Sequence, residues 1–211
     1  MAPARGAALP LLLVLPAVLA GPSSAAAPLP PLPDANLSWT DAATLTVGGR
    51  GFSDTATFWE RLPTAANGTV NRAVYHLAKN SAGMSVRFTA AAETVGVRYR
   101  LTSAEVDMWH MPSTGMSGAD LYVHDSGNSS WRWVGTCHVI AAGSDQPLPY
   151  VLTTFAFPKA LRPPGFDGAV RFKLHLPTYN GVTDVAIGVA EGQEAPSPDT
   201  PDTVKPIVWC A

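Results

Sequence analysis

Charge and cysteine are both scarce in this sequence of 211 residues. Only 14% of the residues are charged, the formal net charge is −2, and there are two cysteines. The weak, scattered charge excludes a highly charged disordered chain and a strongly cationic nucleic-acid binder. Two cysteines are too few for a disulfide-dense small domain or a zinc finger with four cysteine ligands. The 20 prolines and 18 glycines predict many turns and few long helices.

The first twenty residues have the organisation of a signal peptide. Arg5 supplies the positive charge, an uncharged apolar stretch runs over residues 7–19, and Val18 and Ala20 stand at the −3 and −1 positions of a cleavage site. The sequence therefore predicts export through the secretory pathway, with an uncleaved N-terminal anchor as the alternative. No later uncharged apolar run is long enough to cross a bilayer, so we expect no membrane association after cleavage.

Three Asn-x-Ser/Thr tripeptides agree with this route. They make glycosylation candidates of Asn36, Asn67 and Asn128 and favour a secreted glycoprotein.

Composition divides the remaining chain into a body and two tails. Residues 21–43 begin as an Ala/Pro-rich tract and are predicted to be a mobile stalk, and residues 191–205 form a Pro-rich acidic linker. The intervening residues 44–190 are close to the commonest size of a single domain.

The body alternates apolar and polar residues with period two. The clearest run is 94–102, and the pattern recurs at 169–175 and at 131–137, where Trp131, Trp133 and Cys137 share one face that we expect in the core. No stretch keeps helical spacing over three turns. Seven to nine short strands without intervening helices predict an all-β fold, an antiparallel β-sandwich of jelly-roll or related type. Further β-rich runs occupy residues 84–89, 120–124, 150–157 and 182–189.

Few residues suggest chemistry. The five histidines show no metal-binding spacing, so we expect no metal, and nothing predicts a cofactor. Trp109 and His110 lie in a predicted loop that either binds a ligand or packs under a sheet. Trp59, Trp109 and Tyr179 lie near turns and are the candidates for stacking on sugars. Cys137 is either a core residue or, in an oxidising compartment, the disulfide partner of Cys210.

Several segments together carry a family resemblance. They are residues 58–63 (FWERLP), 81–88 (SAGMSVRF), 111–122 (MPSTGMSGADLY), 131–133 (WRW) and 176–182 (LPTYNGV). In this order they resemble the N-terminal β-sandwich of one group of SGNH (GDSL-like) hydrolases. Its defining segment reads Gly-x-Asp-Leu-Tyr, here Gly118 to Tyr122. Independently of the resemblance, the glycines allow tight turning, and Asp120 has a side chain that can hydrogen-bond loop amides.

The resemblance implies an accessory domain. In that family the sandwich precedes an α/β domain that hydrolyses esters of acylated sugars or related compounds with a Ser/His/Asp triad. Residues 206–211 resemble the start of that domain's first strand, and no catalytic residue can be carried over. We therefore expect no hydrolase activity from the chain as written, with an SGNH catalytic domain as its partner.

A stand-alone carbohydrate-binding, lectin-like module is the alternative function, and a structural extracellular domain without a ligand is a weaker one. The candidates for an interface with a domain or a ligand are Trp109, His110, Asp120, Tyr179 and Asn180.

Overall fold

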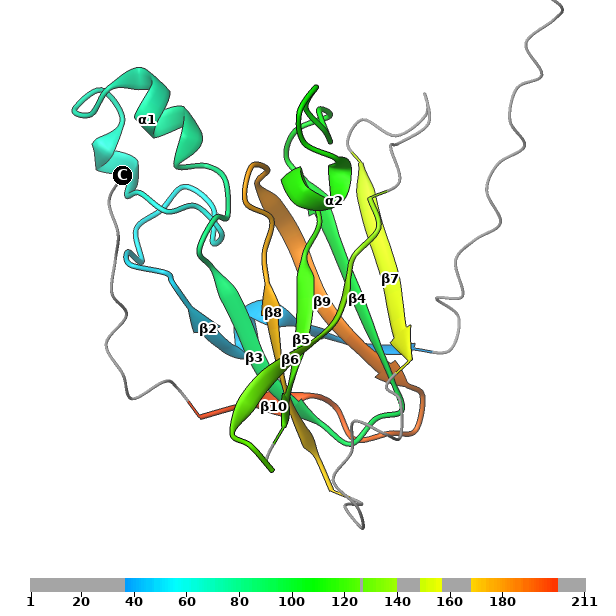
Figure 1. The fold of residues 1–211 in the computed structure, drawn as a ribbon. Coiled ribbons are helices and arrows are strands. Elements are labelled where there is room, and N and C mark those ends of the chain that lie inside the picture. The colour runs from blue at the N-terminus through cyan, green and yellow to red at the C-terminus, as the bar shows by residue number, and fades with distance from the viewer. Residues whose placement is uncertain (1–36, 126, 140–148, 157–167, 201–211) are drawn as a thin grey trace, which may run out of the picture. The chain divides into compact units, whose positions relative to one another are not determined.

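Two antiparallel sheets make up the fold (Figure 1). The computed structural model describes residues 37–125, 127–139, 149–156 and 168–200, all within the second of two units of the chain, Pro33–Ala211. The predicted signal peptide, Asn36, Cys210 and residues 206–211 lie outside the described residues. No helix in the described ranges is long and apolar enough to span a membrane.

The four-stranded sheet has the order β1-β9-β4-β7, and the six-stranded sheet has the order β10-β3-β8-β5-β6, with β2 also paired to β3. The first sheet contains β1 (Leu37–Asp41), β9 (Val182–Ala190), β4 (Thr94–Leu101) and β7 (Tyr150–Ala156). The second contains β2 (Thr46–Gly48), β3 (Ser85–Ala90), β5 (Asp120–Asp125), β6 (Ser130–Thr136), β8 (Val170–His175) and β10 (Ser197–Pro198). Every pairing between them is antiparallel, which confirms the all-β prediction; the jelly-roll assignment stays a prediction.

One hydrophobic core joins the two sheets. The alternation at 94–102 behaves as predicted, because Val97 and Tyr99 of β4 are buried while Arg100 points outward and is half exposed. Their partners across the core include Phe88 of β3 and Phe172 of β8, whose rings stack 5.2 Å apart. Fully burying such side chains contributes about 1.5–3 kcal/mol each, so this alternation is the main stabilising feature of the fold.

The prediction for β6 is wrong about its tryptophans. Tyr122 of β5 pairs with Trp133, but Leu121 pairs with Gly135, so Val134 is an extra residue in β6. Such a β-bulge reverses which side chains face the core beyond it. Cys137 is therefore buried as predicted, whereas Trp133 is 60% exposed.

The ordered body extends beyond the predicted domain on both sides. Residues 37–41, assigned to the stalk, form β1 and pair with β9, and Ser197–Pro198, assigned to the linker, form β10 beside β3. Arg171 holds the second segment through two bonds to the Asp199 carboxylate, at 2.9 and 3.0 Å. Short helical turns complete the described structure: η1 (Ala42–Thr44), η2 (Thr64–Ala66), α1 (Arg72–Leu77) and α2 (Ser113–Met116).

Candidate functional site

Three connections meet at the end of the sandwich that carries α1 and α2 (Figure 1). The backbone N–H of Ser81, which follows α1, donates to the carbonyl oxygen of Asn180 at 3.2 Å. The N–H of Tyr179 donates in turn to the carbonyl oxygen of Met116 at 3.0 Å. The connections α1–β3, β4–β5 and β8–β9 are thus tied together, and we call this region the loop end.

The segment 111–122 is built into the loop end by close backbone approach. The buried hydroxyl of Tyr99 donates to the carbonyl oxygen of Ser117 at 2.9 Å. A Cβ at Gly118 would lie 2.4 Å from the carbonyl oxygen of Thr114 and 2.9 Å from Cγ2 of Thr136. Any side chain at 118 would therefore force α2 away from β6, so glycine is required there by packing.

Asn180 is a structural hub and not an exposed ligand contact. Its side chain is fully buried, and its Oδ1 accepts from the N–H of Ser103 at 3.1 Å. Its Nδ2 donates to the carbonyl oxygen of Glu105 at 3.0 Å and to Oγ of Ser117 at 3.1 Å. These bonds join the β8–β9 connection to the β4–β5 connection, so the amide organises the loop end.

Asp120 bonds to side chains of β6 instead of to loop amides. Its Oδ1 accepts from the hydroxyl of Thr136 and from Nε1 of Trp133, the latter at 3.4 Å. The carboxylate therefore sits on the outer surface of the six-stranded sheet, where it fixes β6 against β5.

Trp109 and His110 lie at the tip of a tight turn. Met108 and Met111 exchange two backbone hydrogen bonds of 2.9 and 3.0 Å beneath them, and the two rings lie 4.6 Å apart. Trp109 is 96% exposed, as predicted for a surface aromatic, and Tyr179 is also exposed. The prediction that Trp59 is a surface aromatic is wrong. Trp59 is buried, and its ring lies edge-on to Phe58 with the ring centroids 4.7 Å apart.

Exposed apolar side chains also line α1. Val74 and Leu77 are three residues apart in this short helix, Val70 precedes its N-cap, and all three are exposed by a third or more. Exposed apolar side chains grouped as on α1 are typical of a contact surface.

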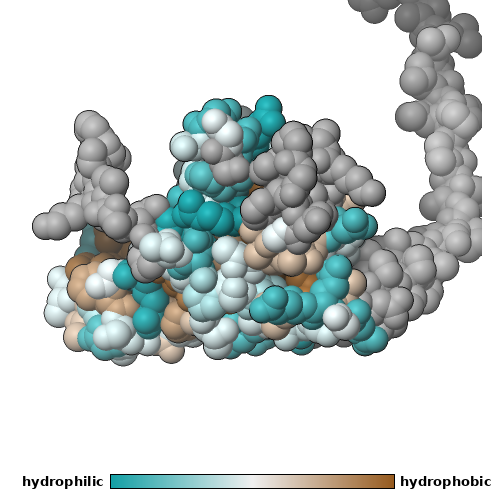
Figure 2. Space-filling view, turned by 90° about the horizontal axis from the view of Figure 1, so that it is seen from below, coloured by the Kyte–Doolittle hydropathy of each residue, from teal (hydrophilic) through white to brown (hydrophobic). Residues whose placement is uncertain are grey.

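At the opposite end of the domain, Figure 2 shows hydrophobic residues in separate patches among hydrophilic ones.

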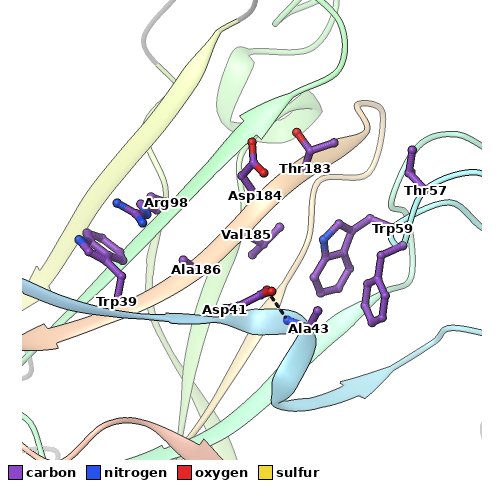
Figure 3. Close-up of a pocket in the computed structure, with 11 residues that line it drawn as sticks. Trp39, Asp41, Ala43, Thr57, Trp59, Arg98, Thr183, Asp184, Val185 and Ala186 are labelled. Atoms are coloured by element: carbon purple, nitrogen blue, oxygen red, sulfur yellow. Dashed lines mark hydrogen bonds between the residues drawn. The ribbon is translucent and has the colours of Figure 1, made fainter.

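A shallow hollow of about 630 Å³ lies on the outer face of the four-stranded sheet. Figure 3 shows Trp39 and Arg98 at one end and Trp59 at the other, above a floor formed by Val185 and Ala186 of β9. The ring of Trp39 lies against two positions where a Cβ would come within 3.0 Å of it, Gly96 and Gly188. The guanidinium of Arg98 lies 4.4 Å from the Trp39 ring centroid.

Two acidic side chains edge the same hollow. Asp184 is paired with Arg100 at 2.9 Å, and Asp41 accepts from the N–H of Ala43 at 2.9 Å. Both carboxylates at the edge of the hollow are thus already engaged within the domain.

The buried titratable groups are unsuited to nucleophilic chemistry. Burial raises the pKa of the Cys137 thiol to about 12, and burial also raises the pKa of the Tyr99 hydroxyl well above its usual value. A thiol with so high a pKa is not a nucleophile near neutral pH. Cys137 forms no disulfide with a described residue, and its pairing with Cys210 stays a prediction because Cys210 lies outside the described residues.

The pKa of His175 on β8 is lowered from its usual value. Partial burial and the nearby charge of Lys173 lower it, and Asp120 partly opposes them. The described residues contain no group of three or more His, Cys, Asp or Glu side chains able to hold a metal ion.

A model of the family "GxDLY: N-terminus of Esterase_SGNH_hydro-type" matches residues 37–195. The chain belongs to this family. Among solved structures, it is similar to a putative GDSL-like lipase from Bacteroides ovatus, with a TM-score of 0.62 and 18% identity. The match covers 78% of this chain and 44% of that one, so the chain spans less than half of that protein. At this identity the likeness shows the fold alone, and no curated protein matches the chain.

The structure shows what the residues of the GxDLY signature do in the fold. Gly118 permits the close approach of α2, Leu121 is in the core, and Asp120 and Tyr122 lie on the outer face of the six-stranded sheet. The sequence predicted the tight turn at the glycines. It missed the exposed Trp133 beside Asp120 and the hollow around Trp39, since both depend on strand register.

Proposed function

We propose that this domain is the accessory, non-catalytic N-terminal module of a secreted SGNH-type esterase. Family membership over residues 37–195 supports the association with such esterases. The similar lipase structure supports it as well, since more than half of that chain lies beyond the part matched here.

One observation at the loop end carries the non-catalytic role. The polar groups of the signature segment form hydrogen bonds inside the domain. The Asp120 carboxylate accepts from β6, and Ser117 accepts from Tyr99 and Asn180. Four large apolar side chains are also exposed there: Val74 and Leu77 of α1, and Trp109 and Tyr179 on the neighbouring turns. Such exposed apolar side chains are suited to binding another protein surface.

An esterase assay tests the non-catalytic half of the proposal. The purified chain is incubated with p-nitrophenyl acetate beside a heat-killed sample of the same protein. We expect equal rates, because no residue of a Ser/His/Asp triad can be assigned. Hydrolysis well above the heat-killed control would overturn the non-catalytic role.

A binding experiment tests whether this domain docks on its SGNH catalytic domain through the exposed apolar side chains of α1. The partner is the SGNH domain encoded with this domain, either in the continuing reading frame or in a neighbouring gene, and binding is followed by calorimetry. Val74→Glu and Leu77→Glu each place a charge in the proposed interface, so each is expected to weaken binding at least about tenfold. His76→Glu adds a charge on the other side of α1 and should leave the affinity unchanged. Equal affinities for all three variants would refute docking through α1.

Export is tested separately from docking. When the full chain is expressed in a secreting eukaryotic cell line, we expect the product in the medium to begin at Gly21. Asn67 and Asn128 are exposed, so both are expected to carry glycans that an endoglycosidase removes. A cell-retained chain that begins at Met1 would overturn secretion.

A further inference from the structure

The bulge in β6 creates an aromatic outer surface on the six-stranded sheet. Leu121 and Val123 of β5 and Phe172 and Leu174 of β8 face the core, so the residues between them face outward. We call this surface the signature face, since it includes the aspartate and the tyrosine of the family signature. Its members are Asp120, Tyr122 and His124 of β5, Trp131 and Trp133 of β6, and Lys173 and His175 of β8.

Trp133 is exposed but held in place. It pairs across the strands with Tyr122, and its Nε1 donates to Oδ1 of Asp120 at 3.4 Å. Its side chain is nevertheless 60% exposed. A fixed, exposed ring loses little conformational freedom when it binds, which favours it as a contact residue.

The neighbouring rings support one another edge to face. His124 and Trp131 lie 5.1 Å apart at 77°, and Tyr122 and His175 lie 5.5 Å apart at 81°. Trp131 and Trp133 are two residues apart on one strand, so their Cα atoms lie about 7 Å apart along it. This spacing is comparable to that of neighbouring sugar rings in a polysaccharide, whose apolar C–H faces pack on aromatic rings.

Charges of both signs lie beside these rings: the Asp120 carboxylate next to Trp133, and two cations next to Trp131. The Lys173 ammonium and the Arg171 guanidinium lie 5.9 and 5.7 Å from the Trp131 ring centroid. Arg171 is neutralised by Asp199 at 2.9 Å, whereas Lys173 forms no ion pair within the described part of the chain. At the Trp131 end of the signature face, a ligand therefore meets the Lys173 cation, whereas the Asp120 carboxylate lies at the Trp133 end.

We propose that the signature face binds an acidic polysaccharide, whose sugar rings stack on Trp133 and Trp131 and whose carboxylates pair with Lys173. Stacking alone would suit any sugar, and the lysine selects for uronic acids. The surface is an open sheet, which favours contact along an extended chain over enclosure of a small molecule. The inference does not depend on the partner domain, because binding requires neither hydrolysis nor docking.

Affinity electrophoresis of the full chain tests the proposal. Gels contain polygalacturonate or alginate as the acidic ligand and hydroxyethylcellulose or xylan as the neutral one, and single-stranded DNA is tested as a competitor that offers stacking bases and negative charge. We expect retardation by the acidic polysaccharides only, weaker at high salt. Trp133→Ala should lower this affinity at least about tenfold, and Lys173→Gln about threefold.

Two further variants separate loss of contact from loss of fold. Trp109→Ala removes another exposed tryptophan from the loop end and should bind like the unmodified chain. Trp133→Phe keeps a ring without the bond to Asp120 and should bind between the unmodified chain and Trp133→Ala. The unfolding midpoint of each variant, measured by circular dichroism, shows whether the domain is intact.

Several outcomes would overturn the inference. They are the absence of retardation in every polysaccharide gel, equal retardation by neutral and acidic polysaccharides, tighter binding of single-stranded DNA, and undiminished binding by an intact Trp133→Ala variant. Binding lost in Trp109→Ala but kept in Trp133→Ala would place the glycan site at the loop end instead.

Discussion

Replacing Asn180 by alanine tests whether its buried amide organises the loop end. The substitution removes the acceptor for the N–H of Ser103 and the donor for the carbonyl oxygen of Glu105 and the hydroxyl of Ser117. A buried polar group left without its partner costs about 1–3 kcal/mol. Ser103 and Glu105 reach water in part, which lowers their share, whereas Ser117 is fully buried.

We expect Asn180→Ala to lower the free energy of unfolding by about 3 kcal/mol. For a domain of this size, that loss corresponds to a fall in the unfolding temperature of roughly 6–12 °C. Urea titration followed by circular dichroism measures the first quantity, and a thermal scan of the same sample measures the second.

The matched control is Asn67→Ala in protein made without glycosylation. Asn67 is exposed, and its side chain forms no hydrogen bond to a described residue, so the expected change is within about 0.5 kcal/mol. A loss below about 1 kcal/mol for Asn180→Ala would refute the role of its amide, since the bonds it makes would then be replaced by water at little cost.

Three other substitutions probe separate features. Gly118→Ala drives a Cβ into a backbone carbonyl oxygen and should cost about 1–3 kcal/mol in urea unfolding, whereas Gly115→Ala meets only a flexible methionine and should cost less. In a Cys210→Ser background, Cys137 should resist a thiol reagent until urea unfolds the chain; rapid labelling of native protein would contradict its burial. The His175 pKa is lowered from 6.5 by folding, so the unfolded chain binds more protons and stability should rise with pH up to about 6.5. His175→Gln should flatten that rise, and an unchanged slope would exclude it as the source.

Much of the sheet structure follows from local sequence. The runs predicted at 94–102 and 169–175 correspond to Thr94–Leu101 and Val170–His175, because each alternates around one core. β1 was missed because it is five residues long and adjoins a Pro-rich tract, and only its pairing with β9 makes it a strand. The sequence predicts Asn180 only as an interface candidate, because its hydrogen-bond partners come from distant connections that no local pattern shows.

The β6 error has a different origin. Alternation counts one residue per partner, and the extra residue at Val134 breaks that count between Trp133 and Cys137. The isolated Gly135 was the available signal, since glycine inside a strand often marks a bulge. A Cβ at this position would lie 2.8 Å from the Phe155 ring, so the inward glycine is needed where the strand shifts.

The two bonds to Asp120 have different consequences for the domain. The bond from Thr136 holds β6 to β5 and is a sufficient structural reason for the carboxylate. The bond from Trp133 orders a large side chain that remains 60% exposed, so it costs conformational entropy and returns little buried area. The bond from Thr136 explains the carboxylate as part of the fold, and under the proposal above the bond from Trp133 orders the ring for stacking.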